Sequence, residues 1–153
     1  MRKIDLVVVH CSDSDVPAHD NIETVRKWHT LPKMPESVKK DIASGKLPKS
    51  ETYKYGNGWS DIGYQYFIDK SGVVHRGRSE ATVGAHVSGH NARSIGVCVS
   101  GRERFTDAQF RALKELLKDI CTRHKLDIKT QVKGHRDLQP AKTCPNFEIK
   151  DVL

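Results

Sequence analysis

The sequence lacks any long hydrophobic run. Its longest uninterrupted apolar stretch, Leu6 to Val9, is far shorter than the roughly 20 residues with which a helix crosses a bilayer. The N-terminal segment MRKIDLVVVHCS also lacks the apolar region and the small-residue cleavage site of a secretory signal peptide. We therefore expect a protein that is not inserted in a membrane and that is cytoplasmic as synthesised.

Cysteine is also scarce. The four cysteines, Cys11, Cys98, Cys121 and Cys144, form no CxxC pair and no regular framework, which favours reduced thiols over disulfides. For the first three, packing in the core is the expected role, because free cysteine behaves as a small hydrophobic residue. Cys144 differs from them because it stands in a loop segment, directly before Pro145.

The sequence has no basic stripe interleaved with aromatic residues, no recognition-helix pattern and no internal repeat. Aromatic residues make up 7% of the chain, and its 26 basic residues are scattered. The net charge of +7 predicts attraction to polyanions in general, including nucleic acid, anionic lipid and an anionic cell wall. Without a dedicated pattern, we do not expect nucleic acid to be the main ligand. We expect the chain to be a monomer.

The patterns that are present predict one domain. A chain of 153 residues that is 37% hydrophobic suits a single core. β-Branched runs predict strands and helical stripes predict helices in the order β-α-β-β-β-α-β, which is an α/β or α+β domain around a mixed sheet. The expected elements are a strand at 5–12, a helix at 20–29, a hairpin at 64–77, a strand at 94–101, a helix at 106–125 and a strand at 130–135.

Residues 30 to 58 interrupt this pattern with a lysine-rich stretch that prolines and glycines punctuate. Within it Met34, Val38 and Ile42 recur every four residues, and Gly45 is placed to end a helix. We interpret the whole chain, 1–153, as a single domain with a surface excursion inserted at about 30–58. Loops of this length are uncommon and often functional.

The segment GHRDLQPAKTCPNF, residues 134 to 147, places a histidine and a cysteine nine positions apart between prolines that prevent one continuous helix. Catalytic zinc typically takes three protein ligands and leaves a fourth position for water. His10 and His135 each end a predicted strand, and Cys144 follows in the loop. One sheet could bring these three together, although a lone histidine at a strand end is more often structural.

Six segments occur together and in order: VVVHCS, VRKWH, WSDIGYQYFIDKSGVV, VGAHVSGHNARSIGVCVSG, FTDAQFRALKELL and GHRDLQPAKTCPNF. In this combination the sequence closely resembles the type-2 N-acetylmuramoyl-L-alanine amidases, which include the small phage lysozymes with amidase activity and the animal peptidoglycan recognition proteins. The resemblance covers nearly the whole chain outside residues 30 to 58. It implies the amidase fold, a single α/β domain with a central mixed β-sheet flanked by helices.

The resemblance also implies an activity and its residues. The family hydrolyses the amide between N-acetylmuramic acid and L-alanine of peptidoglycan with one zinc ion, whose ligands match His10, His135 and Cys144. The catalytic tyrosine of the phage enzymes matches Tyr64, and Lys142, which matches the lysine two positions before the ligand cysteine, is expected to be catalytic as well. The implied function is cell-wall lysis by an endolysin that acts on the wall after release.

The segment GAHVSGHN implies substrate contacts, because it lines the muropeptide groove in this family and contains His86 and Asn91. The other histidines have structural expectations; His29, for example, is expected to pack beside Trp28 on a helix.

Two other functions remain open at this level. One is a recognition module that binds peptidoglycan without cutting it, although Cys144 favours the enzyme because such relatives typically replace the ligand cysteine. The other is an inhibitor or partner of a second protein that uses the basic excursion at 30–58.

Overall fold

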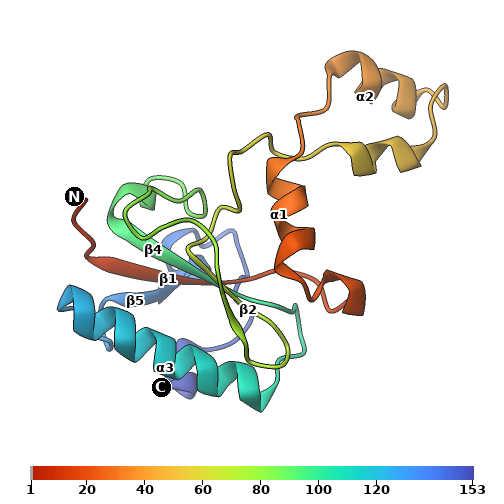
Figure 1. The fold of residues 1–153 in the computed structure, drawn as a ribbon. Coiled ribbons are helices and arrows are strands. Elements are labelled where there is room, and N and C mark those ends of the chain that lie inside the picture. Colours follow the sequence, from red (N-terminus) through yellow and green to blue (C-terminus); the bar gives the residue numbers. More distant parts are fainter. Residues whose placement is uncertain (1) are drawn as a thin grey trace.

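The computed structural model describes residues 2–153 and consists of one five-stranded mixed sheet with helices around it (Figure 1). The strand order is β3-β2-β4-β1-β5; β3 is antiparallel to β2, and the other neighbours are parallel. This confirms the predicted α/β fold with a mixed sheet. The strands are β1 (Leu6–Cys11), β2 (Tyr66–Ile68), β3 (Val74–Arg76), β4 (Ser94–Val99) and β5 (Val132–Gly134).

The helices include the two that the sequence predicts outside the excursion and several shorter ones. None of those within residues 2–153 is long and apolar enough to cross a membrane. The α-helices are α1 (Ile22–Thr30), α2 (Glu36–Ala43), α3 (Asp107–His124), α4 (His135–Leu138) and α5 (Ile149–Val152). The 3₁₀ helices are η1 (Pro17–His19), η2 (Lys49–Lys54) and η3 (Asn91–Arg93).

Helix α3 covers one face of the sheet, as Figure 1 shows. It begins at a capping box in which the Thr106 hydroxyl accepts from the Gln109 N–H and the Gln109 side chain accepts from the Thr106 N–H. Its apolar face, with Leu113, Leu117 and Ile120 fully buried, packs in the largest core cluster. The helical period of the sequence therefore places this face against the sheet.

Strand β1 lies between β4 and β5 in the sheet and positions the site. All six of its residues are buried because β4 and β5 flank it on both sides and both faces are covered. Parallel pairing places the carboxyl ends of β1, β4 and β5 at one edge of the sheet. The register pairs Val9 of β1 with Gly134 of β5. His10 directly follows Val9 and His135 directly follows Gly134, so the two histidines lie side by side.

The segment 31–58 projects away from the sheet as an arm that carries α2 and η2 (Figure 1). At its base, backbone N–H groups of residues 56 to 59 donate to carbonyl groups of residues 28 to 32. Neither α2 nor η2 contains a buried residue, and Met34, Val38 and Ile42 belong to none of the three core clusters. The arm therefore contributes little to the core.

Replacing residues 33 to 56 with a short Gly/Ser linker is expected to leave the protein folded. The free energy of unfolding should change by no more than about 1 kcal/mol, because the deleted residues are not part of the core and loop length has a weak effect. The amidase activity that the family resemblance implies should change in its preference among types of cell wall, since the arm joins α1 to the segment that bears Tyr64. Thermal melting and wall digestion measure the two effects. A variant that no longer unfolds cooperatively would show that the arm supports the core.

Candidate metal centre and pocket

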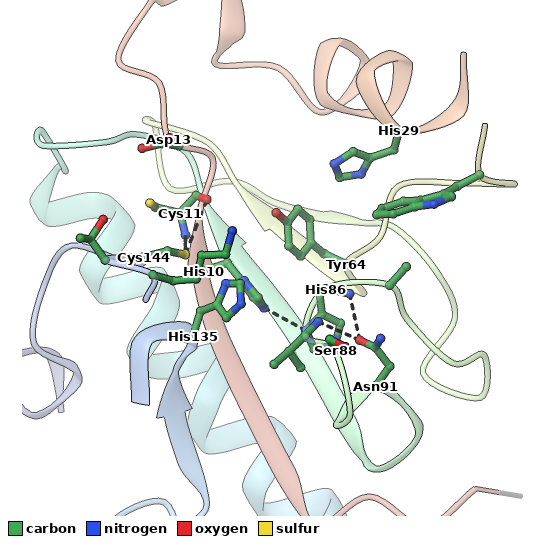
Figure 2. A pocket seen from close by; sticks show the side chains of 15 residues that line it. His10, Cys11, Asp13, His29, Tyr64, His86, Ser88, Asn91, His135 and Cys144 are labelled. Carbon is green, nitrogen blue, oxygen red and sulfur yellow. Dashed lines mark hydrogen bonds between the residues drawn. The ribbon is translucent and has the colours of Figure 1, made fainter. Parts of the chain in front are cut away.

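His10, His135 and Cys144 converge at the carboxyl edge of the sheet (Figure 2). One nitrogen from each histidine and the Cys144 Sγ all lie within 4.8 Å of one another. His10 comes from β1, His135 is the first residue of α4 directly after β5, and Cys144 follows in the next loop. The structure thus brings together the three residues that the sequence predicts as ligands.

Each histidine of this cluster is anchored through one ring nitrogen. His135 Nε2 donates to Gln139 Oε1 at 2.5 Å, which leaves Nδ1 as the ring nitrogen available to a metal. His10 Nε2 lies 2.9 Å from His86 Nδ1. Burial, with His86 and His135 nearby, lowers the pKa of His10 well below its ordinary value. His10 is therefore neutral, the form in which imidazole binds metal.

The thiol of Cys144 receives a backbone hydrogen bond. The Cys11 N–H donates to Cys144 Sγ at 3.1 Å. In the protein alone, the hydrogen bond with the Cys11 thiol and burial raise the pKa of Cys144. A coordinated divalent cation deprotonates a thiol outright, and the Cys11 N–H is placed to stabilise that thiolate. Two neutral imidazoles and one thiolate are a donor set that fits zinc.

The cluster lies in a pocket of about 540 Å³. Tyr64 and Lys142, the two predicted catalytic residues, both line it. The Tyr64 ring lies 5.1 Å from the His10 ring, and burial raises the pKa of its phenol well above the ordinary value. Tyr64 therefore keeps its phenolic proton at neutral pH. Lys142 is exposed, on the loop that bears Cys144.

His86 and Asn91 also line the pocket, on the segment before β4. The backbone N–H of His86 and the backbone N–H of Val87 both donate to Asn91 Oδ1, at 2.9 and 2.8 Å respectively. The His86 ring is buried, and its two nitrogens face His10 and Ser94. Burial, with His135 as the next contributor, lowers the pKa of His86 to about 3, so this ring is neutral too.

The expectation for His29 is wrong. Instead of packing beside Trp28, its ring lines the pocket, 5.0 Å from the Trp59 ring and 5.7 Å from the Tyr64 ring. Its Nδ1 accepts from the Gly63 N–H, which leaves the proton on Nε2. Burial and the Arg78 charge lower its pKa to about 4. The available signal was its place in the VRKWH segment, one of the six that carry the family resemblance.

Proteins similar to this chain include amidases, phage endolysins and peptidoglycan-recognition proteins. Residues 1–147 match the family described as N-acetylmuramoyl-L-alanine amidase. The endolysin of Klebsiella phage KP32 is 30% identical over 152 residues, which cover 94% of this chain and 82% of the phage protein.

Solved structures give the same result. The N-acetylmuramoyl-L-alanine amidase LysC from Clostridium intestinale superposes with a TM-score of 0.64 at 26% identity, covering 99% of this chain and 83% of LysC. Drosophila PGRP-LB, at 22% identity, shares the fold with a TM-score of 0.65 over 95% of this chain and 76% of its own. The match over nearly the whole chain, together with the fold and the converging cluster, shows that this protein belongs to the N-acetylmuramoyl-L-alanine amidase family.

Proposed function

We propose that the chain is a zinc-dependent N-acetylmuramoyl-L-alanine amidase in which His10, His135 and Cys144 hold one zinc ion. The observation that carries the proposal is the convergence of these three donors within 4.8 Å in the pocket. His10 lies far from the other two in the sequence, and the pairing of β1 with β5 brings it next to them. When bound, zinc would polarise the scissile carbonyl and lower the pKa of a water molecule to near 7.

The protein itself contributes orientation and proton donors. We assign Lys142 to the oxyanion of the tetrahedral intermediate, because an ammonium has its largest effect where negative charge develops. We assign to Tyr64, which keeps its phenolic proton, the role of orienting the attacking water or giving a proton to the leaving amine. Asn91 and His86 border the pocket on the side away from Cys144 (Figure 2), where we expect the muropeptide to lie.

The biological role proposed is that of an endolysin. The phage relative described above is an endolysin, and this assignment places the protein's action on the cell wall after release. Peptidoglycan is then its partner, and the net charge of +7 favours approach to an anionic wall. A recognition module that only binds peptidoglycan needs no thiolate, so the convergence of Cys144 with both histidines supports the enzyme.

Digestion of purified peptidoglycan tests this proposal. We expect free stem peptides and intact glycan strands, because the bond cut joins N-acetylmuramic acid to L-alanine. A strong chelator should stop the reaction, and one equivalent of zinc should restore it. Mass analysis of the products identifies the bond. Reducing sugar ends, or binding to the wall with no released peptide, would contradict the assignment.

A further inference from the structure

We propose that His86 is a positioning residue that fixes the ring orientation and the tautomer of His10 for metal binding. The inference rests on the proposed zinc site and adds a residue to it. Its starting observation is the hydrogen bond of 2.9 Å between His10 Nε2 and His86 Nδ1. Metal-binding histidines usually donate their second ring N–H to a partner that sets their tautomer.

The direction of this hydrogen bond follows from the donor rules. His10 Nε2 faces His86, so Nδ1 is the nitrogen that remains for a metal, and a neutral ring then has its proton on Nε2. His86 must accept at Nδ1 and therefore has its own proton on Nε2. That nitrogen lies 3.3 Å from the fully buried Ser94 Oγ, which can accept it. Ser94, His86 and His10 thus form one chain with a consistent direction.

The His86 ring is also held sterically. A Cβ at Gly96 would lie 2.7 Å from both Cγ and Cδ2 of the ring, and a Cβ at Gly84 would lie 2.7 Å from Cδ2. Contacts this short do not occur, so only glycine fits at these two positions with the ring in place. Asn91 fixes the backbone of the same segment through its two hydrogen bonds from His86 and Val87. Packing and hydrogen bonding therefore select one position of the ring.

A direct polar contact with substrate is the competing role for His86. Its side chain is buried, with the residue only 9% exposed, and both ring nitrogens face protein partners. The ring thus offers no free hydrogen-bonding atom to a ligand. His135, by comparison, has a hydrogen-bond partner for its Nε2 in Gln139, so both proposed histidine ligands are anchored through Nε2.

The test compares zinc affinity among three variants by competition with a chromophoric chelator. His86→Ala should bind zinc about 10- to 100-fold more weakly, as expected when the partner of a metal-bound histidine is lost. His86→Asn should recover most of this loss, because its Oδ1 can accept near the position of Nδ1. His90→Ala is the matched control; His90 lies in the same segment but contacts Arg93, and its affinity should equal that of the wild type.

Cobalt substitution gives a second readout that does not depend on activity. The absorption spectrum of Co²⁺ in His86→Ala should differ from that of the wild type, and the His86→Asn spectrum should resemble the wild type. Gly96→Ala should alter affinity in the same direction as His86→Ala by displacing the ring. Circular dichroism verifies that each variant is folded.

The outcomes separate this proposal from the one on which it rests. Equal zinc affinity and an unchanged cobalt spectrum in His86→Ala, with a raised KM for muropeptide, would make His86 a substrate contact and overturn the proposal. Loss of metal even at saturating zinc would make it a ligand, which also overturns it. If the wild-type protein bound no zinc, the proposed function itself would fail.

Discussion

Replacing Cys144 with alanine is expected to remove the bound zinc and nearly all amidase activity. The variant keeps two imidazoles but loses the only thiolate of the cluster. A catalytic metal supplies several kcal/mol of transition-state stabilisation, and each 1.36 kcal/mol is tenfold in rate. Turnover should therefore fall by more than about 10³-fold. Elemental analysis measures the zinc, and the release of stem peptides measures turnover. His10→Ala and His135→Ala should behave in the same way.

Cys121→Ala is the matched control for this loss. Cys121 is a buried cysteine on α3 that packs in the main core cluster, away from the pocket. Its replacement should keep zinc and turnover and lower only the stability. If the three ligand variants retained full zinc stoichiometry, the site would be misplaced. If they lost zinc but kept turnover, the metal would have no part in the reaction.

The second large effect concerns Lys142 and Tyr64, which we propose to act without binding the metal. Lys142→Ala should lower turnover by about 10²–10³-fold, as the loss of one oxyanion donor typically does. Tyr64→Phe should lower it by about 10²–10⁴-fold, the usual contribution of a proton-transfer group. Zinc content and ground-state binding should change little, because the charge that these groups stabilise develops in the transition state. Single-turnover kinetics on soluble muropeptide measure the effect.

Two controls sharpen this prediction. Lys142→Arg should recover only part of the rate, since the guanidinium is planar and larger than the ammonium. Tyr66→Phe removes a hydroxyl two residues farther along the same chain segment, where it contacts Glu80 and not the metal cluster. Its turnover should equal that of the wild type. A Lys142 or Tyr64 variant that loses zinc would have a structural role, and one with wild-type turnover would have no catalytic role.

Much of the fold could be predicted from local patterns. The apolar run of β1, the helical stripe and capping box of α3 and the turn of the β2–β3 hairpin each determine their element within a short stretch of sequence. The order of strands and helices then limits the topology to a mixed sheet. The three ligands were predicted because two of them lie at the ends of predicted strands and because the family resemblance covers all three.

Other parts depend on contacts between distant residues. The helical turn α4 begins at His135, where local sequence predicted the end of a strand and then a loop. The position of the His29 ring depends on the hydrogen bond that it accepts from the Gly63 N–H. The orientation of the His86 ring depends on the close approach of the Gly96 backbone. Periodicity within one segment does not specify such pairings, because the register and the packing of other segments decide them.

X-ray absorption at the zinc edge reports whether one zinc ion is held by two histidines and one cysteine. For wild-type protein with one equivalent of zinc, we predict one sulfur neighbour at about 2.3 Å and the remaining nitrogen or oxygen neighbours at about 2.0–2.2 Å. The sulfur neighbour should disappear in Cys144→Ser and persist in Cys121→Ala. A wild-type spectrum with no sulfur neighbour, or with two, would contradict the assignment of His10, His135 and Cys144 as the ligands.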